Sequence, residues 1–180
     1  DLKGNLWKVK LGVASSTLTL TSAFVQSSIP EPLFIAKDSL NALQPITAQP
    51  ESGRHSDGGL MIYFGTGKYF ELTDTDVSSP QTQSFYGVRD DLKDVPASKV
   101  VRSDLVAQTI DAEDSSTFAG FTVRLTSNNS VNYRSKEGWY MDLKLASAGA
   151  GIGERVVNQP ILRGDRVIFT TLVPSGEACS

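Results

Sequence analysis

Apolar and polar residues alternate along most of this chain with a period of two. Successive side chains of a β-strand point to opposite faces, so the pattern predicts half-buried strands, whereas helical periodicity is poor. The alternating runs are rich in Val, Ile, Thr, Tyr, Phe and Trp, which pack well on a pleated surface. An all-β fold is therefore expected. Its strands are predicted at Asn5–Leu11, Thr17–Phe24, Leu60–Phe64, Tyr69–Leu72, Ser84–Arg89, Leu105–Ile110, Thr122–Thr126, Trp139–Leu145, Arg155–Leu162 and Val167–Val173.

One stretch, SDLVAQTIDAED at residues 103–114, has some helical character, with Ser103 as a possible cap. Its β-branched and Gln content favours a strand over a helix. We therefore expect this stretch to extend the all-β pattern.

Two tight hairpins are expected where glycine separates apolar runs. Glycine tolerates the positive φ that such turns require, which indicates one hairpin at Gly65-Thr66-Gly67. The pair Gly164-Asp165 indicates a second one, with Arg163 and Arg166 facing each other across it.

The second hairpin also contains the triplet Arg163-Gly164-Asp165. The triplet has two interpretations: an adhesion tripeptide read by a host receptor, or only the turn. The turn is favoured, because Gly-Asp fits a two-residue hairpin without any ligand.

A pattern of an aromatic residue followed by alternation recurs at residues 4–11, 84–92 and 138–145. A second pattern, with a Pro-containing segment before a strand near glycine, recurs at 45–67 and 155–172. Stacked blades of antiparallel strands would give such an alternation, so an antiparallel β-propeller is predicted. At about 40–45 residues for each blade, roughly three to four blades fit, which is only part of a ring. Residues 1–180 are therefore expected to be a segment of one β-propeller domain of a larger protein.

Composition narrows the classes of function. The chain has 180 residues, 39% of them hydrophobic and 21% charged, which is enough for one folded domain with a core. A formal net charge of −3 and scattered basic residues argue against a nucleic-acid surface. No apolar run approaches the length of a membrane span, so no membrane-spanning segment is expected.

Cys179 is the only cysteine. It either pairs with a cysteine outside this chain or remains an unpaired thiol.

The residues that usually carry catalysis or metals are sparse. His55 is the only histidine, and with Asp57 it lies in a polar loop, where a solvated imidazole is expected rather than a catalytic one. The acidic stretches 73–76 and 111–114 lack the regular alternation of a calcium loop; solvated loops are favoured over weak calcium sites. The larger aromatic side chains are expected in a core rather than around a ligand. They are Trp7, Tyr63, Phe64, Phe85, Trp139, Tyr140 and Phe169.

Several long stretches occur in the order found in one protein family. They are DLKGNLWKVKL, GGLMIYFGTGKYFEL, QTQSFYGVRDD, SDLVAQTI, LTSNNSVNYRSKEGWYMDL and GERVVNQPILRGDRVIFTTLVPSGEACS. On these motifs the chain resembles the PilY family, large type IV pilus tip-associated proteins of Gram-negative bacteria. The resemblance is weakest over 12–31 and 91–102, which are expected to be variable loops.

The resemblance implies a C-terminal β-propeller distantly similar to quinoprotein propellers, in a protein exported to the periplasm and the cell surface. It implies a non-enzymatic role in pilus assembly, retraction control, twitching motility and adhesion. The implied partners are the minor pilins of the pilus tip complex and a host or abiotic surface. We expect the loops 51–59, 73–83 and 91–103 to face partners. The alternative function is a fragment of a quinoprotein-type, PQQ-like dehydrogenase.

The resemblance also implies calcium. Family members typically carry a calcium loop just upstream of the element with which this chain begins, so its ligands are expected before Asp1. Calcium is thus implied for the parent protein, with no ligand among these residues. In the hairpin at 163–165, family members often read Arg-Gly-Gly, which supports the turn interpretation.

Overall fold

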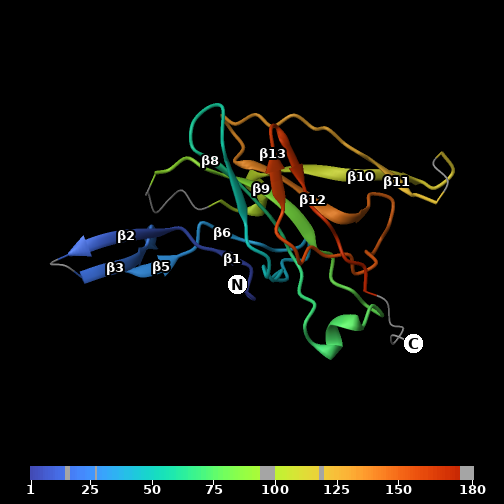
Figure 1. The fold of residues 1–180 in the computed structure, drawn as a ribbon, viewed down its shortest axis with the longest axis horizontal. Helices are drawn as coiled ribbons and strands as arrows, with labels where there is room; N and C mark the ends of the chain where they lie inside the picture. The colour runs from blue at the N-terminus through green and yellow to red at the C-terminus, as the bar shows by residue number, and fades with distance from the viewer. Residues whose placement is uncertain (15–16, 27, 94–99, 118–119, 175–180) are drawn as a thin grey trace.

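The computed structural model describes residues 1–14, 17–26, 28–93, 100–117 and 120–174. Strands joined by irregular segments dominate it (Figure 1), which confirms the all-β prediction. The described 3-10 helices are η1 (Leu72–Thr75) and η3 (Arg102–Asp104). The strands are β1 (Asn5–Leu6), β2 (Val9–Ala14), β3 (Thr17–Ser22), β4 (Phe24–Gln26), β5 (Ile29–Glu31), β6 (Phe34–Ile35), β7 (Glu51–Arg54), β8 (Leu60–Gly65), β9 (Ser84–Asp90), β10 (Val106–Asp114), β11 (Val123–Thr126), β12 (Gly138–Leu145), β13 (Ile161–Arg163) and β14 (Arg166–Ile168).

A six-stranded sheet in the order β11-β10-β12-β9-β8-β7 forms the centre of the molecule. Its neighbouring strands are antiparallel except for β10 and β12, which run parallel. Four separate two-stranded pairs are also formed: β1–β6, β2–β3, β4–β5 and β13–β14. Two features were not expected from a pattern of antiparallel blades: the size of this sheet and its parallel pair.

The strand β9 lies at the middle of the sheet and is buried along nearly its whole length. Its side chains alternate between the two faces of the sheet, as in any strand. They are buried on both faces, because other segments cover each face. Tyr86 and Val88 point to one face, and Phe85 points to the other. Gly87 also belongs to the second face, where a β-carbon would lie 2.7 Å from the indole nitrogen of Trp139.

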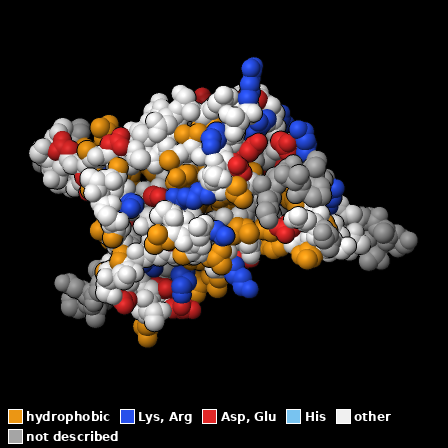
Figure 2. Space-filling model, turned by 180° about the vertical axis from the view of Figure 1, so that it is seen from behind, with side chains coloured by type: hydrophobic (Ala, Val, Ile, Leu, Met, Phe, Trp, Pro, Cys, Tyr) orange, Lys and Arg blue, Asp and Glu red, His pale blue; other side chains and the backbone are white. Residues whose placement is uncertain are grey.

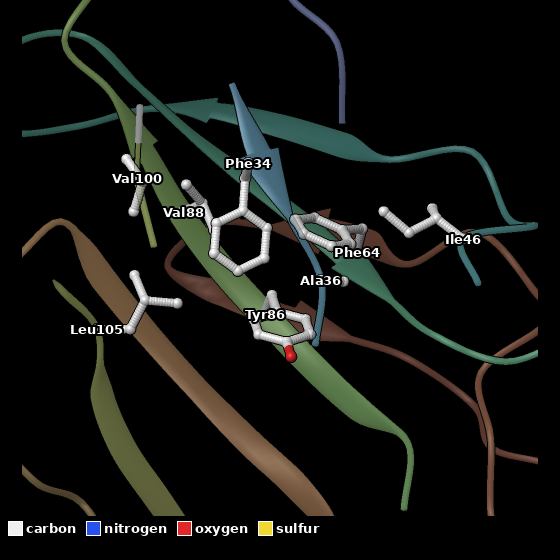
Figure 3. Close-up of a cluster of buried hydrophobic side chains, with 8 residues drawn as sticks. All are labelled: Phe34, Ala36, Ile46, Phe64, Tyr86, Val88, Val100 and Leu105. Carbon is white, nitrogen blue, oxygen red and sulfur yellow. The ribbon is translucent and has the colours of Figure 1, made fainter. Parts of the chain in front are cut away.

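The first face carries the largest core cluster. The rings of Phe34, Phe64 and Tyr86 face one another at its centre (Figure 3), and Phe64 stacks on Tyr86 with centroids 5.2 Å apart. Phe34 comes from the short strand β6, so this cluster holds the N-terminal segment against the main sheet. Its buried members are Phe34, Ala36, Ile46, Phe64, Tyr86, Val88, Val100 and Leu105.

The second face packs against the C-terminal segment. Phe85 stacks on Phe169 with ring centroids 3.9 Å apart, and Val156 fills the place where Gly65 has no side chain. Trp139 and Tyr63 pack at the edge of this cluster. The expected core residues are thus divided between the two faces. Trp7 is the exception, since 43% of it remains exposed.

The strands β2 and β3 form a two-stranded ribbon that projects from the body of the molecule (Figure 1). The pair β4–β5 lies at its base, where Phe24 and Leu33 are buried with Ala23. The strand predicted at Thr17–Phe24 is confirmed by β3. The rest of 12–31 was expected to be a variable loop, and in the described residues most of it also forms strands.

The first predicted hairpin is wrong. The strand β8 ends at Gly65 and pairs with β7 and β9, and no strand forms over 69–72. Gly67 does adopt a positive φ of 132°, but its amide donates to the carbonyl of Pro45. A β-carbon on Gly67 would lie 2.4 Å from Cβ of Arg155, so glycine serves a close approach of two segments there.

Other boundaries also moved. The predicted strand Arg155–Leu162 shrinks to β13, and Arg155 makes only an isolated bridge to Leu172. The loop expected at 51–59 begins with the strand β7. The strand preference for 103–114 is confirmed by β10.

Candidate functional site

The structure confirms the second predicted hairpin. Strands β13 and β14 pair with Arg163 opposite Arg166, and Gly164 and Asp165 form the turn. Gly164 takes a φ of +56°, whereas Asp165 keeps an ordinary negative φ. A type II′ turn needs glycine at its first central position only, which explains why aspartate follows without strain.

The four side-chain positions from Arg163 to Arg166 are exposed. The side chains of Arg163, Asp165 and Arg166 make no hydrogen bond or ion pair within the described part of the chain. The opposite side of the hairpin is anchored, because Leu162 packs where Gly53 of β7 has no side chain. The structure thus presents the triplet on a supported tip, with its charged groups available to a ligand.

A second candidate surface was missed by sequence reasoning: one face of the β2–β3 ribbon. Leu11 pairs with Leu20, so their side chains share a face with those of Val9 and Leu18. These four side chains, here called the aliphatic face, are 50–71% exposed. The opposite face of the ribbon carries Lys10, Thr19 and Thr21.

The ribbon therefore separates apolar from polar side chains without a covering layer in the described residues. Seen from behind, apolar side chains reach the surface at several places, including the base of the projecting ribbon (Figure 2). Contiguous exposed apolar surface of this kind marks contact sites. The alternation of apolar and polar residues in VKL (9–11) and TLTLT (17–21) indicates an apolar face and a polar face. It does not indicate whether the apolar face is buried or exposed to solvent.

A buried polar network continues the first face of the sheet beyond the aromatic cluster. Arg102, at the start of η3, donates to both oxygens of Asp142, at 2.7 and 2.8 Å. It also donates to the hydroxyl of Tyr86 at 2.9 Å, and its guanidinium lies 3.7 Å from the ring centroid of Tyr140. This one side chain joins η3 to β9 and β12.

The network is completed by Gln44 and Ser84. The hydroxyl of Tyr86 lies 2.5 Å from Oε1 of Gln44, and Gln44 in turn donates to Ser84 at 2.8 Å. Ser84 donates to Asp142 at 2.6 Å. Burial raises the pKa of Tyr86 to about 12, so its hydroxyl keeps its proton and can donate. Buried polar groups that satisfy one another in this way fix one arrangement of the core.

Two grooves border the sheet. One, of about 680 Å³, has a floor of Trp139, Met141 and Phe169 on the second face. At its rim Arg124 pairs with Glu154 at 2.6 Å. The other, of about 710 Å³, opens on the first face beside Arg102 and Tyr140. Both have the size of small-ligand sites.

The carboxylate of Asp1 is already occupied by hydrogen-bond donors of this chain. One oxygen accepts from the amides of Lys3 and Asn5, both at 2.9 Å, and the other from the side chains of Asn5 and Trp7. Within the described residues no group of three or more acidic, His or Cys side chains could hold a metal ion.

The remaining sequence candidates fall in ordinary settings. Nδ1 of His55 accepts from the amide of Asp57, a contact within a turn, and its ring lies against Tyr133. The carboxylate of Asp74 is held by Lys68 and two backbone amides. Cys179 and part of the loop 91–103 lie outside the described residues. Among the described residues, none of the helices could serve as a membrane span.

Residues 1–123 match the family model of the PilY1 beta-propeller domain. The chain is 33% identical to a type IV pilus biogenesis factor PilY1 of Pseudomonas aeruginosa, with 100% of this chain aligned. It is 36% identical, over 97% of its length, to a homologue of this factor from Xylella fastidiosa. The crystal structure of the Pseudomonas aeruginosa PilY1 C-terminal domain matches 96% of the chain, with a TM-score of 0.80 and 31% identity.

The chain is much shorter than these relatives. It spans 17% of the Pseudomonas protein, 11% of the Xylella protein and 40% of the crystallised C-terminal domain.

Proposed function

The chain belongs to the PilY1 beta-propeller family, and from this premise we propose that it forms part of the propeller domain of a type IV pilus assembly factor. All of residues 1–180 would belong to that one domain. Its role would be non-enzymatic: it would contribute contact surfaces to pilus assembly, and through the pilus to twitching motility and attachment. Such a protein would be exported to the periplasm and the cell surface of a Gram-negative bacterium.

The aliphatic face of the β2–β3 ribbon is the observation that carries a binding role. A projecting ribbon that exposes Val9, Leu11, Leu18 and Leu20 on one side would lose favourable burial if nothing covered it. We propose that it binds the pilus tip complex, with a minor pilin as the partner. The polar face with Thr19 and Thr21 would remain in solvent.

We expect Leu20→Glu to weaken binding to minor pilins about tenfold or more, because a carboxylate would be buried without a partner. Surface pili should decrease accordingly. Leu20 is 64% exposed, so the free energy of unfolding should change by less than about 0.5 kcal/mol. Co-purification of the full-length protein with minor pilins, and counts of surface pili, measure the effect.

The matched control is Thr21→Glu, which places the same charge on the opposite face of the same strand. It should leave binding and piliation unchanged. Equal effects of both variants would contradict the proposal. A clear loss of stability in Leu20→Glu alone would show that the rest of the parent protein covers this face.

The exposed tip of the β13–β14 hairpin supports a second role, contact with a host receptor through Arg163, Gly164 and Asp165. We expect Asp165→Glu to reduce attachment to integrin-bearing cells about tenfold, since the longer side chain displaces the carboxylate. Asp57→Glu, at another exposed turn, is the control. Unchanged attachment of the Asp165→Glu bacteria would leave the triplet as a turn only.

Calcium dependence is proposed for the parent protein, with its ligands in the segment upstream of Asp1.

The alternative to the non-enzymatic function is an enzymatic one, a PQQ-like dehydrogenase, which requires a bound quinone. The absorbance spectrum of the purified full-length protein separates the two functions, because a quinone absorbs where protein does not. A quinone band that persists through purification would overturn the non-enzymatic proposal.

A further inference from the structure

The groove of about 680 Å³ on the second face of the sheet has an aromatic floor. The floor consists of Trp139, Met141 and Phe169, and each of these side chains is only partly buried. The rings of Trp139 and Phe169 pack on Phe85 with centroids 5.9 and 3.9 Å away, which holds both rings from the side of the core. The groove thus offers a fixed aromatic surface on which the apolar face of a ligand can pack.

One wall of the groove follows the segment 126–130, and Gln108 of β10 holds this segment in place. Oε1 of Gln108 accepts from the hydroxyl of Ser127 and from the amide of Asn129, both at 2.8 Å. Its Nε2 donates to the carbonyl of Asn129 at 2.7 Å. The wall is therefore ordered before any ligand arrives, which reduces the entropy that binding would cost.

Several polar side chains of the groove make no hydrogen bond within the described residues. They are the hydroxyls of Thr126, Ser130, Tyr133 and Thr171 and the side-chain amide of Asn128. Hydroxyls and amides can both donate and accept hydrogen bonds. The groove therefore suits a ligand whose own polar groups also do both.

The charges of the groove are already paired. Among the described residues that line it, only Arg124 and Glu154 are charged, and they form an ion pair at 2.6 Å. Arg124 has a second acidic partner in Glu113, at 2.7 Å. An anionic ligand would meet two carboxylates around one cation, so the groove favours a neutral ligand.

We propose that this groove binds a neutral pyranose sugar. A pyranose ring has a face of C–H groups that packs on an aromatic ring, and it carries hydroxyls at its edge that donate and accept. Trp139 and Phe169 contact the C–H face. Asn128, Ser130 and Thr171 bind the hydroxyls. The inference does not rest on the proposed pilus role, since no residue of the aliphatic face or of the hairpin tip lines the groove.

Saturation-transfer NMR of the full-length protein tests the proposal with three glycosides: methyl β-glucoside, methyl β-galactoside and methyl N-acetyl-β-glucosaminide. At least one of them should bind with a Kd on the order of 1 mM, as expected for a ligand of this size. Sorbitol carries similar hydroxyls without the rigid ring and should bind about tenfold more weakly, because it cannot cover the aromatic floor. The methyl uronide that matches the best glycoside, with a carboxylate in place of the C6 hydroxymethyl group, should also bind about tenfold more weakly.

Variants of the wall provide the second arm. Asn128→Ala combined with Thr171→Val removes polar groups that make no hydrogen bond within the described residues, so the protein should fold normally and bind the best glycoside about tenfold more weakly. Asn158→Ala, at an exposed asparagine outside the groove, is the control and should leave the affinity unchanged.

Four outcomes overturn the proposal. They are equal binding of sorbitol and the best glycoside, tighter binding of the uronide, unchanged affinity of the double variant, and absence of binding by all three glycosides. In the last case the groove is covered by another part of the parent protein or holds only water. None of these outcomes bears on the binding of minor pilins by the β2–β3 ribbon, which the Leu20→Glu variant tests separately.

Discussion

Replacing Arg102 with methionine is expected to lower the free energy of unfolding by about 3 kcal/mol. The substitution would leave Asp142 partly buried without its cation and would remove a donor from Tyr86 and from the carbonyl of Lys37. Removing one partner of a buried ion pair typically costs about 3–5 kcal/mol. The lower end applies, because 16% and 22% of the two side chains reach solvent. Chemical denaturation of the two proteins measures the difference.

Two further variants identify the cause. Arg134→Met removes an exposed arginine of similar size and should change stability by less than about 0.5 kcal/mol. Adding Asp142→Leu to Arg102→Met should recover part of the loss, because the uncompensated carboxylate is then gone. A double variant as unstable as the sum of the two single ones would show that the ion pair does not couple η3 to the sheet.

A second large effect is expected for Phe34→Ala. Phe34 is 1% exposed and packs on Phe64 and Tyr86, with centroids 6.0 and 5.1 Å away. Truncating such a ring removes apolar burial and leaves a cavity, at a cost of about 3–5 kcal/mol. Because Phe34 belongs to the two-residue strand β6, the loss should fall mainly on the N-terminal segment.

Amide hydrogen exchange distinguishes this local effect from general loosening. Amides of β1 and β6 should exchange at least tenfold faster in Phe34→Ala, whereas those of β9 and β12 should change less. Phe121→Ala removes a ring that is 73% exposed and should alter neither stability nor exchange. Uniform acceleration across all strands would contradict the view that Phe34 chiefly anchors the N-terminal segment.

The sequence pattern predicted the strand content better than the pairing. The strands β8, β9 and β12 carry their own signal, because alternation and aromatic residues describe a strand that packs against others. The failure at residues 65–72 has a physical cause: a glycine in a tight turn and a glycine beneath another segment look alike in sequence. Gly67 permits the approach of Arg155, and that contact depends on residues far along the chain.

The candidate sites, too, could be predicted from the sequence where they depend on neighbouring residues, and not where they depend on contacts between distant segments. The tip at Gly164-Asp165 is local, and its turn could be predicted from two residues. The groups that approach one another across the sheet could not. Arg102 of η3 and Asp142 of β12 come together only through the packing of segments distant in sequence. The aliphatic face of the β2–β3 ribbon was visible as alternation, but alternation also describes a strand whose apolar side is buried in its own domain.

The place of β9 between β8 and β12 has a consequence for synthesis. Tyr86 pairs with Phe64 on one side and with Tyr140 on the other, so the central strand completes its hydrogen bonds only when the later strand emerges. Strand β10 also depends on β12, because it pairs in parallel with Trp139 and Tyr140 of that strand. Until then a nascent chain carries apolar strands with unpaired edges, the kind of species that aggregates. Folding of this domain therefore depends on late, non-local contacts, which are slow to form, and a chain stalled before Gly138 would need a chaperone to remain soluble.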